Sequence, residues 1–414
     1  MKRTILAVSV CLSAFPSGAY AVDWAVNSTL SQTVELNDNE FLRQMLAGGT
    51  LGSYSTITAN ATARTPTSKF VFDGDISYRK YFGGTDGTQS ESLAGGFKMH
   101  YETTGKEATD RNYLDSSWHR QSTAFALLGD LGEVSNARGF LDTTTVGGGV
   151  ERNLSALDFV ALSARSSYTS YDPGTGGTPF IDTTAVGSWR HRVSSIAALN
   201  ASSEVEALHF DNSLNTDIVI LRENAGVEAS LSPRLSFRGT AGVAYVQTER
   251  GSPVLSLTPS SATSVSGSAT EFITDMLLTY KMFPDTTLTL AGTQSVAPSV
   301  VGSLTKRTTI RAGLTRNVNS RTTVSFSADA SEQTSAGTTS DFLSASIVYS
   351  YLLTREWNAQ LTYRYLHRLA SAGTLAIDPI TGIPVPTSSA FGAASSNSIM
   401  LVVSRSVSIL PDGH

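Results

Sequence analysis

Cysteine is almost missing from this sequence of 414 residues, which holds only Cys11. A single cysteine excludes an internal disulfide and a metal site built from several thiolates. Long apolar runs are missing as well, since none approaches the roughly 20 residues that a transmembrane helix needs. The 30 basic and 35 acidic residues lack the basic excess of a nucleic-acid-binding protein. We therefore expect no nucleic-acid partner and no helical anchor.

An apolar run does occur at the N-terminus, but it is short. Lys2 and Arg3 precede the run from Ile5 to Phe15, and small residues follow as far as Ala21. This order is typical of a secretory signal peptide with an A-x-A cleavage site. We predict a signal peptide over residues 1–21 with cleavage after Ala21, so that the exported chain contains no cysteine.

Elsewhere the sequence follows the two-residue period of β-strands. Over residues 341–368, apolar and aromatic side chains alternate with polar ones on both sides of the polar turn at residues 354–356. Each half has about twelve to fourteen residues, which suits a tilted strand that crosses a bilayer. Strands of soluble sandwiches seldom exceed about ten residues. An exported chain of such strands, without a helical anchor, satisfies its backbone hydrogen bonds in a membrane only as a closed barrel.

We predict an all-β fold, a transmembrane antiparallel up-and-down β-barrel of about 18 strands over residues 22–414, with 16 strands as the alternative. The strands are expected near residues 24–36, 51–64, 68–82, 90–103, 112–128, 139–152, 156–171, 183–197, 201–212, 217–231, 234–249, 269–283, 286–296, 303–317, 321–333, 341–353, 356–369 and 397–410. Connections after even-numbered strands are mostly tight, and those after odd-numbered strands are mostly longer. This asymmetry indicates short periplasmic turns and longer extracellular loops, with both termini in the periplasm.

Four places interrupt the pattern. The connection at residues 104–111 is too long for a tight turn, so that turn is extended or the strand count slips there. The strand near 201–212 changes parity between Ala207 and Leu208, which predicts a bulge. Three glycines at 147–149 lie inside a strand and suit a sharp bend. Arg405 falls on the lipid-facing parity of the last strand, which leaves the register of that strand open.

The first hairpin carries a family resemblance. Its residues 34–41 (VELNDNEF), the turn at 65–67 and the alternation at 70–81 resemble the opening of the bacterial outer-membrane β-barrel porins often found with exopolysaccharide gene clusters. Turn-then-alternation units such as 232–236 and 319–324 resemble the same group over most of the exported chain. The resemblance implies an outer-membrane pore and, in some members, the outer exit for a secreted polysaccharide. A periplasmic polysaccharide-export component would then be its partner, besides outer-membrane lipid.

Charged residues concentrate on one parity of the expected strands, which we assign to the lumen because charges toward lipid are costly. The basic residues expected in the lumen are Arg79, Lys98, Arg165, Arg190, Arg192, Arg222, Arg238, Arg307, Arg311, Arg364 and Arg368. The acidic ones are Asp73, Asp75, Glu102, Glu151, Glu228, Asp275 and Asp329. They form either a lining that selects anionic solutes or a set of cross-strand pairs that stiffen the wall.

Three smaller clusters admit other readings. His209, Asp211 and Ser213 near a rim could form a hydrolase site, but nucleophilic catalysis requires the base within about 3 Å of the hydroxyl, and ordinary rim polarity explains them. Residues 37–40 could hold calcium through oxygen ligands but lack the full loop spacing, which favours a turn. The aromatic residues near strand ends suit an interface girdle, with sugar stacking for any that face the lumen; these are Trp24, Trp189, Trp357, Tyr349, Tyr351, Tyr363 and Tyr365.

The function expected from these observations is a passive outer-membrane channel without catalytic residues, cofactor or metal. Export of a polysaccharide is the first substrate hypothesis, and general diffusion of small polar or anionic solutes is the second. A barrel enzyme with a site at its rim is an alternative from another class. A structural or adhesive barrel that binds a partner through its loops at 251–267 and 370–396 is a further one.

Overall fold

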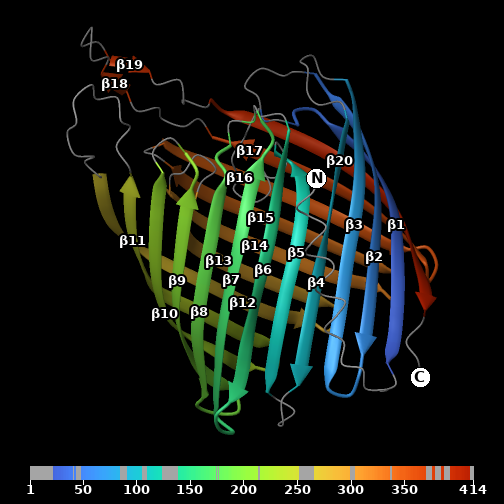
Figure 1. Ribbon diagram of the computed structural model, residues 1–414. Coiled ribbons are helices and arrows are strands. Elements are labelled where there is room, and N and C mark those ends of the chain that lie inside the picture. Colours follow the sequence, from blue (N-terminus) through green and yellow to red (C-terminus); the bar gives the residue numbers. More distant parts are fainter. Residues whose placement is uncertain are drawn as a thin grey trace.

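Eighteen long strands form one antiparallel sheet that closes on itself (Figure 1). The computed structural model describes residues 22–40, 42, 48–83, 91–104, 110–123, 139–173, 175, 177–212, 215–250, 265–298, 304–335, 338–369, 375–377, 384–386 and 392–410. Each strand pairs with its neighbours in sequence, and β20 pairs with both β17 and β1, which closes the barrel. The predicted fold class and strand number are thus confirmed. The expected signal peptide lies outside the described residues.

The strands follow the predicted segments closely. Their bounds are β1 Asp23–Asn37, β2 Thr50–Arg64, β3 Ser68–Gly83, β4 Glu91–Thr104, β5 Arg111–Ser122, β6 Phe140–Asn153, β7 Asp158–Tyr171, β8 Phe180–Arg192, β9 Ala197–Phe210, β10 Thr216–Ser232, β11 Leu235–Arg250, β12 Val265–Phe283, β13 Thr286–Pro298, β14 Leu304–Asn319, β15 Thr322–Ser335, β16 Thr338–Leu352, β17 Trp357–Arg368 and β20 Ala394–Leu410. A small separate hairpin, β18 (Leu375–Ile377) with β19 (Pro384–Pro386), lies in the connection between β17 and β20. No helix among the described residues is long and apolar enough to span a bilayer.

The two rims differ as predicted. Short turns join β2 to β3, β6 to β7, β8 to β9, β10 to β11, β12 to β13, β14 to β15 and β16 to β17 at one rim, which we call the short-turn rim (Figure 1). Strands β4 and β5 pair directly, with residues 105–110 between them, so the strand count does not slip there. The opposite rim, the loop rim, carries most of the longer connections. The barrel strands begin and end at the short-turn rim.

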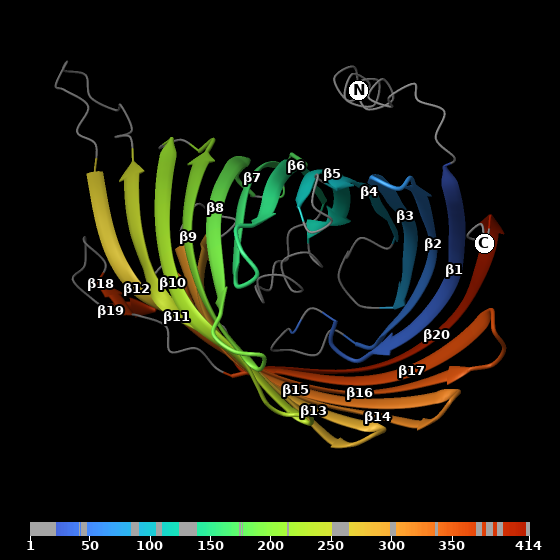
Figure 2. The same ribbon diagram turned by 90° about the horizontal axis from the view of Figure 1, so that it is seen from below.

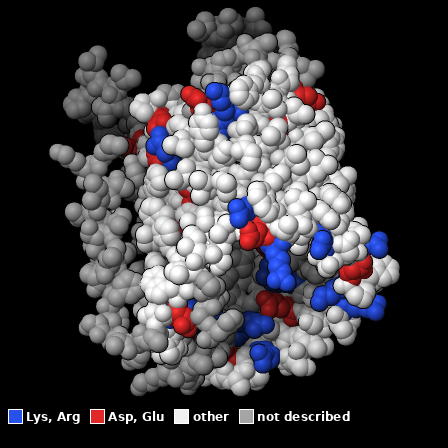
Figure 3. Space-filling view, turned by 90° about the vertical axis from the view of Figure 1, so that its right-hand side faces the viewer, with Lys and Arg blue, Asp and Glu red and all other residues white. Residues whose placement is uncertain are grey.

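The two faces of the wall differ in chemistry. Large apolar side chains occupy alternate positions along the strands and are exposed, including Ile76 (60%), Leu162 (60%) and Ile310 (60%). Most of the wall seen in Figure 3 is uncharged, and its basic and acidic side chains gather at its margins and in a hollow in its lower part. An apolar outer band of this kind is the surface of a membrane-spanning barrel, because soluble proteins rarely expose so large a continuous apolar patch to water.

One part of the inner wall is apolar, and the bulge predicted in β9 does not occur there. Leu208 and Phe210 are 2% and 0% exposed and pack in a cluster with Ile218, Ile220 and Val246. Strand β9 pairs with β8 and β10 without a shift in register, so no bulge occurs. The parity seemed to change because these two apolar side chains face inward, toward a dry cluster and not toward lipid.

The turn before β9 also lies earlier than predicted. It covers residues 193–196, where the Ile196 amide donates to the Ser194 hydroxyl and the Val193 and Ser194 amides both donate to the Ala197 carbonyl. The expected strand boundary fell after Ile196 because Val193 and Ile196 read as strand residues. The Ser194 hydroxyl closes the turn instead.

The glycines at 147–149 lie in a strand whose pairing with both neighbours is continuous in register. Their role is close approach. A Cβ at Gly149 would lie 2.6 Å from the Tyr113 hydroxyl, and a Cβ at Gly148 would lie 2.7 Å from the Tyr113 carbonyl. The ring of Tyr113 thus covers the space that a side chain at Gly149 would take.

Arg405 does face outward on the last strand, and the register of β20 explains how. It lies opposite Trp357 at the short-turn rim. Its guanidinium contacts the Glu356 carboxylate at 3.0 Å and lies 5.7 Å from the Trp357 ring centroid. An outward arginine at a rim with these partners lies at the level of the lipid headgroups, where its charge costs little.

Candidate functional site: two charged cavities in the lumen

The eighteen charged residues expected in the lumen all lie on the strand face opposite the exposed apolar side chains. They are not spread evenly along the barrel. Several of the basic ones gather in two cavities, one at each end of the lumen. We call these the short-turn cavity and the loop-side cavity.

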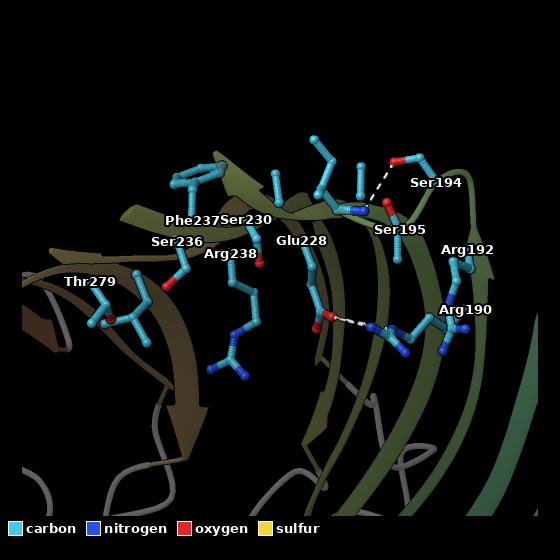
Figure 4. A pocket seen from close by; sticks show the side chains of 15 residues that line it. Arg190, Arg192, Ser194, Ser195, Glu228, Ser230, Ser236, Phe237, Arg238 and Thr279 are labelled. Carbon is cyan, nitrogen blue, oxygen red and sulfur yellow. Dashed lines mark hydrogen bonds and ion pairs between the residues drawn. The ribbon is translucent and has the colours of Figure 1, made fainter. Parts of the chain in front are cut away.

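The short-turn cavity has a volume of about 660 Å³ and is lined by the ends of β8 to β12. Arg190, Arg192 and Arg238 line it together with one carboxylate, that of Glu228 (Figure 4). Arg190 contacts Glu228 at 2.9 Å. Neither Arg192 nor Arg238 has an ion-pair partner within the described part of the chain. This cavity therefore carries basic groups in excess at the mouth formed by the short turns.

The loop-side cavity has a volume of about 560 Å³ and is lined by β1 to β3, β14 to β17 and β20. Its basic side chains are Arg79, Arg307, Arg311 and Arg364, and its acidic ones are Glu35, Glu40 and Asp329. Figure 2 shows the described chain just after β1 inside the ring of strands. Glu40 belongs to that segment and reaches the same cavity as the wall residues.

Glu35 is the centre of a hydrogen-bonded group in the loop-side cavity. Its carboxylate accepts a short hydrogen bond from the Tyr54 hydroxyl and one of 3.3 Å from the Asn37 amide. The Arg364 guanidinium lies 3.9 Å from it, and the Arg79 guanidinium lies 5.2 Å from the Tyr54 ring centroid. Tyr54 and Tyr81 pack edge to face at 5.6 Å. Aromatic rings and a cation therefore face the lumen side by side here.

Glu40 lies outside the strands, and its environment makes it titrate near neutrality. Burial raises the pKa of the Glu40 carboxyl most strongly, the Tyr81 hydroxyl lowers it and the neighbouring Glu35 carboxylate raises it, and the net result is a pKa of about 7. Because this pKa exceeds the ordinary value of 4.5, the folded protein binds the proton more tightly than the unfolded chain. The contribution of Glu40 to stability therefore falls as pH rises from about 4.5 through about 7.

A pH-dependent ion preference is the expected result of this titration. As pH rises through about 7, Glu40 gains a negative charge in the loop-side cavity, and permeability should shift toward cations. In Glu40→Gln the shift between pH 6 and pH 8 should be absent, because the amide does not titrate. Reversal potentials across planar bilayers at each pH measure it. An equal shift in the variant would assign the titration to another group.

Other inward charges are paired across strands. Arg111 contacts Glu151 at 2.6 Å, and Arg222 contacts Glu206 at 2.6 Å. Arg165 reaches Asp182 at 4.0 Å. The lumen thus holds paired groups in the wall and basic groups in excess in the two cavities. Sequence reasoning did not select Glu35, Arg111, Asp182, Glu204 or Glu206, although all five lie on the inward parity.

The remaining charged residues of the predicted lining have varied contacts. Asp73 accepts from the Asn60 amide, Asp329 accepts from the Ser344 hydroxyl at 2.7 Å, and Glu102 lies 3.7 Å from Arg111. Arg368 donates to the carbonyl of Leu42 at 2.9 Å, which holds Leu42 against the wall. Lys98, Asp75 and Asp275 lie on the inward face of β4, β3 and β12.

Of the rim cluster His209, Asp211 and Ser213, only the first two lie within the described residues, and His209 pairs with a different carboxylate. The His209 side chain faces outward, and its Nδ1 lies 2.7 Å from the Asp217 carboxylate on β10. Asp211 precedes a turn, and Ser213 lies outside the described residues. His209 is therefore paired at the outer surface of the loop rim, and its alternation places it away from the lumen.

The polar residues 37–40 hold the first loop to the last strand. The side-chain carbonyl oxygen of Asn37 accepts hydrogen bonds from the Asn39 backbone amide and from the Ser396 hydroxyl, both at 2.9 Å. The Asp38 carboxylate accepts from the backbone and side chain of Asn397. Within the described residues no group of histidine, cysteine or acidic side chains could hold a metal ion. These oxygens accept hydrogen bonds that join the end of β1 to β20.

The aromatic residues separate by face. The tryptophans Trp24, Trp189 and Trp357 and the tyrosines Tyr349 and Tyr363 are exposed on the outer face, as a girdle requires. Tyr351 and Tyr365 share the outward alternation of Tyr349 and Tyr363. The aromatics that face the lumen are others, among them Tyr54, Tyr81 and Tyr113. Their alternation with polar residues could have identified them from the sequence.

No family model matches the chain, and no curated protein matches it. The copper transporter OprC aligns with 9% identity and a TM-score of 0.47, over 92% of this chain and 80% of that one. OccAB2 of Acinetobacter baumannii aligns with 8% identity and a TM-score of 0.46, over 93% and 98%. The FrpB iron transporter of Neisseria meningitidis aligns with 10% identity and a TM-score of 0.46, over 93% and 82%.

Proposed function

We propose that this barrel is an outer-membrane channel for anionic, hydroxyl-rich solutes, and that its cargo is a secreted polysaccharide that bears carboxylates. The observation that carries the proposal is the excess of arginine over carboxylate in both lumen cavities. Three arginines accompany Glu228 in one, and four accompany three carboxyl groups in the other. A basic group at each end of a wet lumen attracts an anion at the first mouth and again before it leaves.

The rest of the lining suits a sugar chain. Planar guanidinium groups bind carboxylates in two-pronged fashion. Tyr54 offers an aromatic ring, and side chains such as Thr56, Asn37 and Ser344 line the same cavity as hydrogen-bond partners for hydroxyl groups. Weak contacts spread over many such groups favour passage, because a solute must leave the lumen as readily as it enters it. The short-turn mouth would face a periplasmic component of the export system.

The test combines genetics with conductance. Deletion of the gene in its native host should trap polymer in the periplasm, and plasmid-borne protein should restore it at the surface. In planar bilayers the purified barrel should conduct, and oligouronates should reduce its current more strongly than neutral oligosaccharides of equal length. Normal surface polymer in the deletion strain together with anion-selective conductance would leave diffusion of small anions as the function. Absence of conductance would remove both.

A further inference from the structure

The ladder between β12 and β13 ends before either strand does. Its last pair toward the loop rim is Thr274 with Gln294, yet β12 begins well before that point and β13 continues to Pro298. Over residues 265–273, β12 has β11 as its only strand partner in the described part of the chain, while β13 stays paired with β14. The Gln294 side-chain amide donates to the Phe272 carbonyl at 2.7 Å. The wall is therefore split between β12 and β13 near the loop rim.

Beyond this split, the end of the β13–β14 hairpin folds into the lumen. We call residues 295–297 and 305–307 the hairpin end. Val296 is 5% exposed and belongs to the apolar cluster of the inner wall, together with Ile273 of β12. The Arg222 guanidinium of β10 donates to the Val296 carbonyl at 2.9 Å. Because β13 lies three strand spacings from β10 in the sheet, roughly 14 Å, this contact requires that the hairpin end overlie the inner face of β11 and β12.

The side chains of the hairpin end agree with this infolding. Val296 and Lys306 lie opposite each other in register and share the parity of Ile310, which is exposed on the outer wall. Lys306 nevertheless contacts Glu271 of β12 at 2.7 Å. Glu271 is an inward residue, since it lies opposite the fully buried Ala244 of β11. The face that is outward along the rest of the hairpin thus lies against the lumen face of β12.

We propose that the hairpin end is a gate with two positions. In the infolded position, which the structure describes, it narrows the loop side of the lumen. In the extended position, β13 continues its ladder with β12 beyond Gln294 and leaves the lumen wider. The existing register prepares this pairing, because Thr274 opposite Gln294 makes Phe272 opposite Val296 the next outward pair. The strand that fits the unpaired edge of β12 is therefore β13 of the same chain.

Each position has contacts that the other lacks. The extended one adds backbone hydrogen bonds along β12, whose edge is otherwise open although closure normally removes edges from a barrel. The infolded one keeps the packing of Val296 and the ion pair of Lys306 with Glu271, whose side chains are 40% and 34% exposed. An ion pair this open to water contributes little. The hairpin end can leave the lumen as a unit, because β13 and β14 stay paired with each other.

Cysteine pairs in a Cys11→Ser background trap the two positions. A short, reducible bis-methanethiosulfonate should join Glu271→Cys with Lys306→Cys in the infolded position. It should join Phe272→Cys with Val296→Cys only in the extended position, because β12 otherwise lies between the two side chains. Mass spectrometry of proteolytic peptides from protein in lipid vesicles measures both yields. If the second pair never forms a crosslink, the hairpin end is a fixed part of the wall and the proposal is overturned.

Conductance in planar bilayers tests what the movement does. Current should fall when the 271–306 pair is crosslinked, recover on reduction, and rise when the 272–296 pair is crosslinked. The matched control, Leu314→Cys with Phe326→Cys, joins outward neighbours of β14 and β15 and should leave the current unchanged. Crosslinks without effect on a measurable current would contradict the gate. The effect on current rests on the proposed channel function, so a barrel that never conducts would remove that function, and the crosslink yields would still decide the movement.

Discussion

Replacing Arg192 and Arg238 with glutamate is expected to reverse the ion preference of the channel. Both side chains line the short-turn cavity, which they share with the Arg190–Glu228 pair (Figure 4). The cavity changes from an excess of two positive charges to an excess of two negative ones. Each charge acts on a permeating ion about 10 Å away with about 0.4 kcal/mol in water. Four units therefore raise the energy of an anion by about 1.6 kcal/mol and lower that of a cation by as much, which amounts to roughly a hundredfold change in the anion-to-cation permeability ratio in dilute salt.

Reversal potentials in a salt gradient measure this ratio, and salt itself supplies a check. The difference between variant and wild type should shrink as ionic strength approaches about 1 M, where the Debye length falls to about 3 Å. The control exchanges two arginines of the same rim that face outward, Arg316→Glu with Arg405→Glu. That protein has the same net charge, and its selectivity should match the wild type. A shift of equal size in the control would indicate the field of the whole protein, not of the lumen.

The deletion and selectivity experiments address different parts of the proposal. Anion preference depends on the arginines of the cavities, and polymer export depends in addition on the bore and on a periplasmic partner. A barrel that selects anions but leaves surface polymer unchanged would keep its channel role with another cargo.

Much of the fold follows from sequence because alternation is local. Residues 341–368 already contain the strand length, the tight turn and the two faces that β16 and β17 display. The predicted lining residues lie on the inward face for the same reason, since a parity assigned once along a strand applies to all its side chains. Polar and proline-containing turn residues predicted the positions of most of the short turns.

Alternation could not show whether an inward side chain contacts water or a buried apolar cluster. Leu208 and Phe210 were read as outward because they are apolar, yet they lie in a dry cluster inside the loop rim. Nor could a local pattern bring Glu40 to Glu35 and Tyr81, since their meeting depends on how a loop folds into the lumen. Contacts between distant strands and loops decide these features, and no short stretch of sequence encodes them.

The inner wall beside the apolar cluster contains the most strongly buried ion pair described, and removal of its arginine is expected to destabilise the barrel. The Arg222 side chain is 13% exposed and contacts Glu204 at 2.5 Å and Glu206 at 2.6 Å; the Glu206 side chain is 7% exposed. Arg222 also donates to the Val296 carbonyl at 2.9 Å. In Arg222→Met two neighbouring carboxylates lose their counter-ion next to apolar side chains, which should lower the unfolding free energy by about 3–5 kcal/mol.

Unfolding of the barrel by guanidinium chloride in lipid vesicles measures that loss of unfolding free energy. Addition of Glu204→Gln and Glu206→Gln to Arg222→Met should restore most of the stability, because the uncompensated charges are then gone. Arg316→Met provides the matched control, since Arg316 is 64% exposed and pairs with Asp285 at a rim, where the loss should be at most about 1 kcal/mol. If the triple variant were as unstable as Arg222→Met, the loss would come from packing of the long side chain and not from charge. If Arg222→Met matched Arg316→Met, water would reach this part of the wall, and the cluster around Ile218 and Ile220 would not be dry.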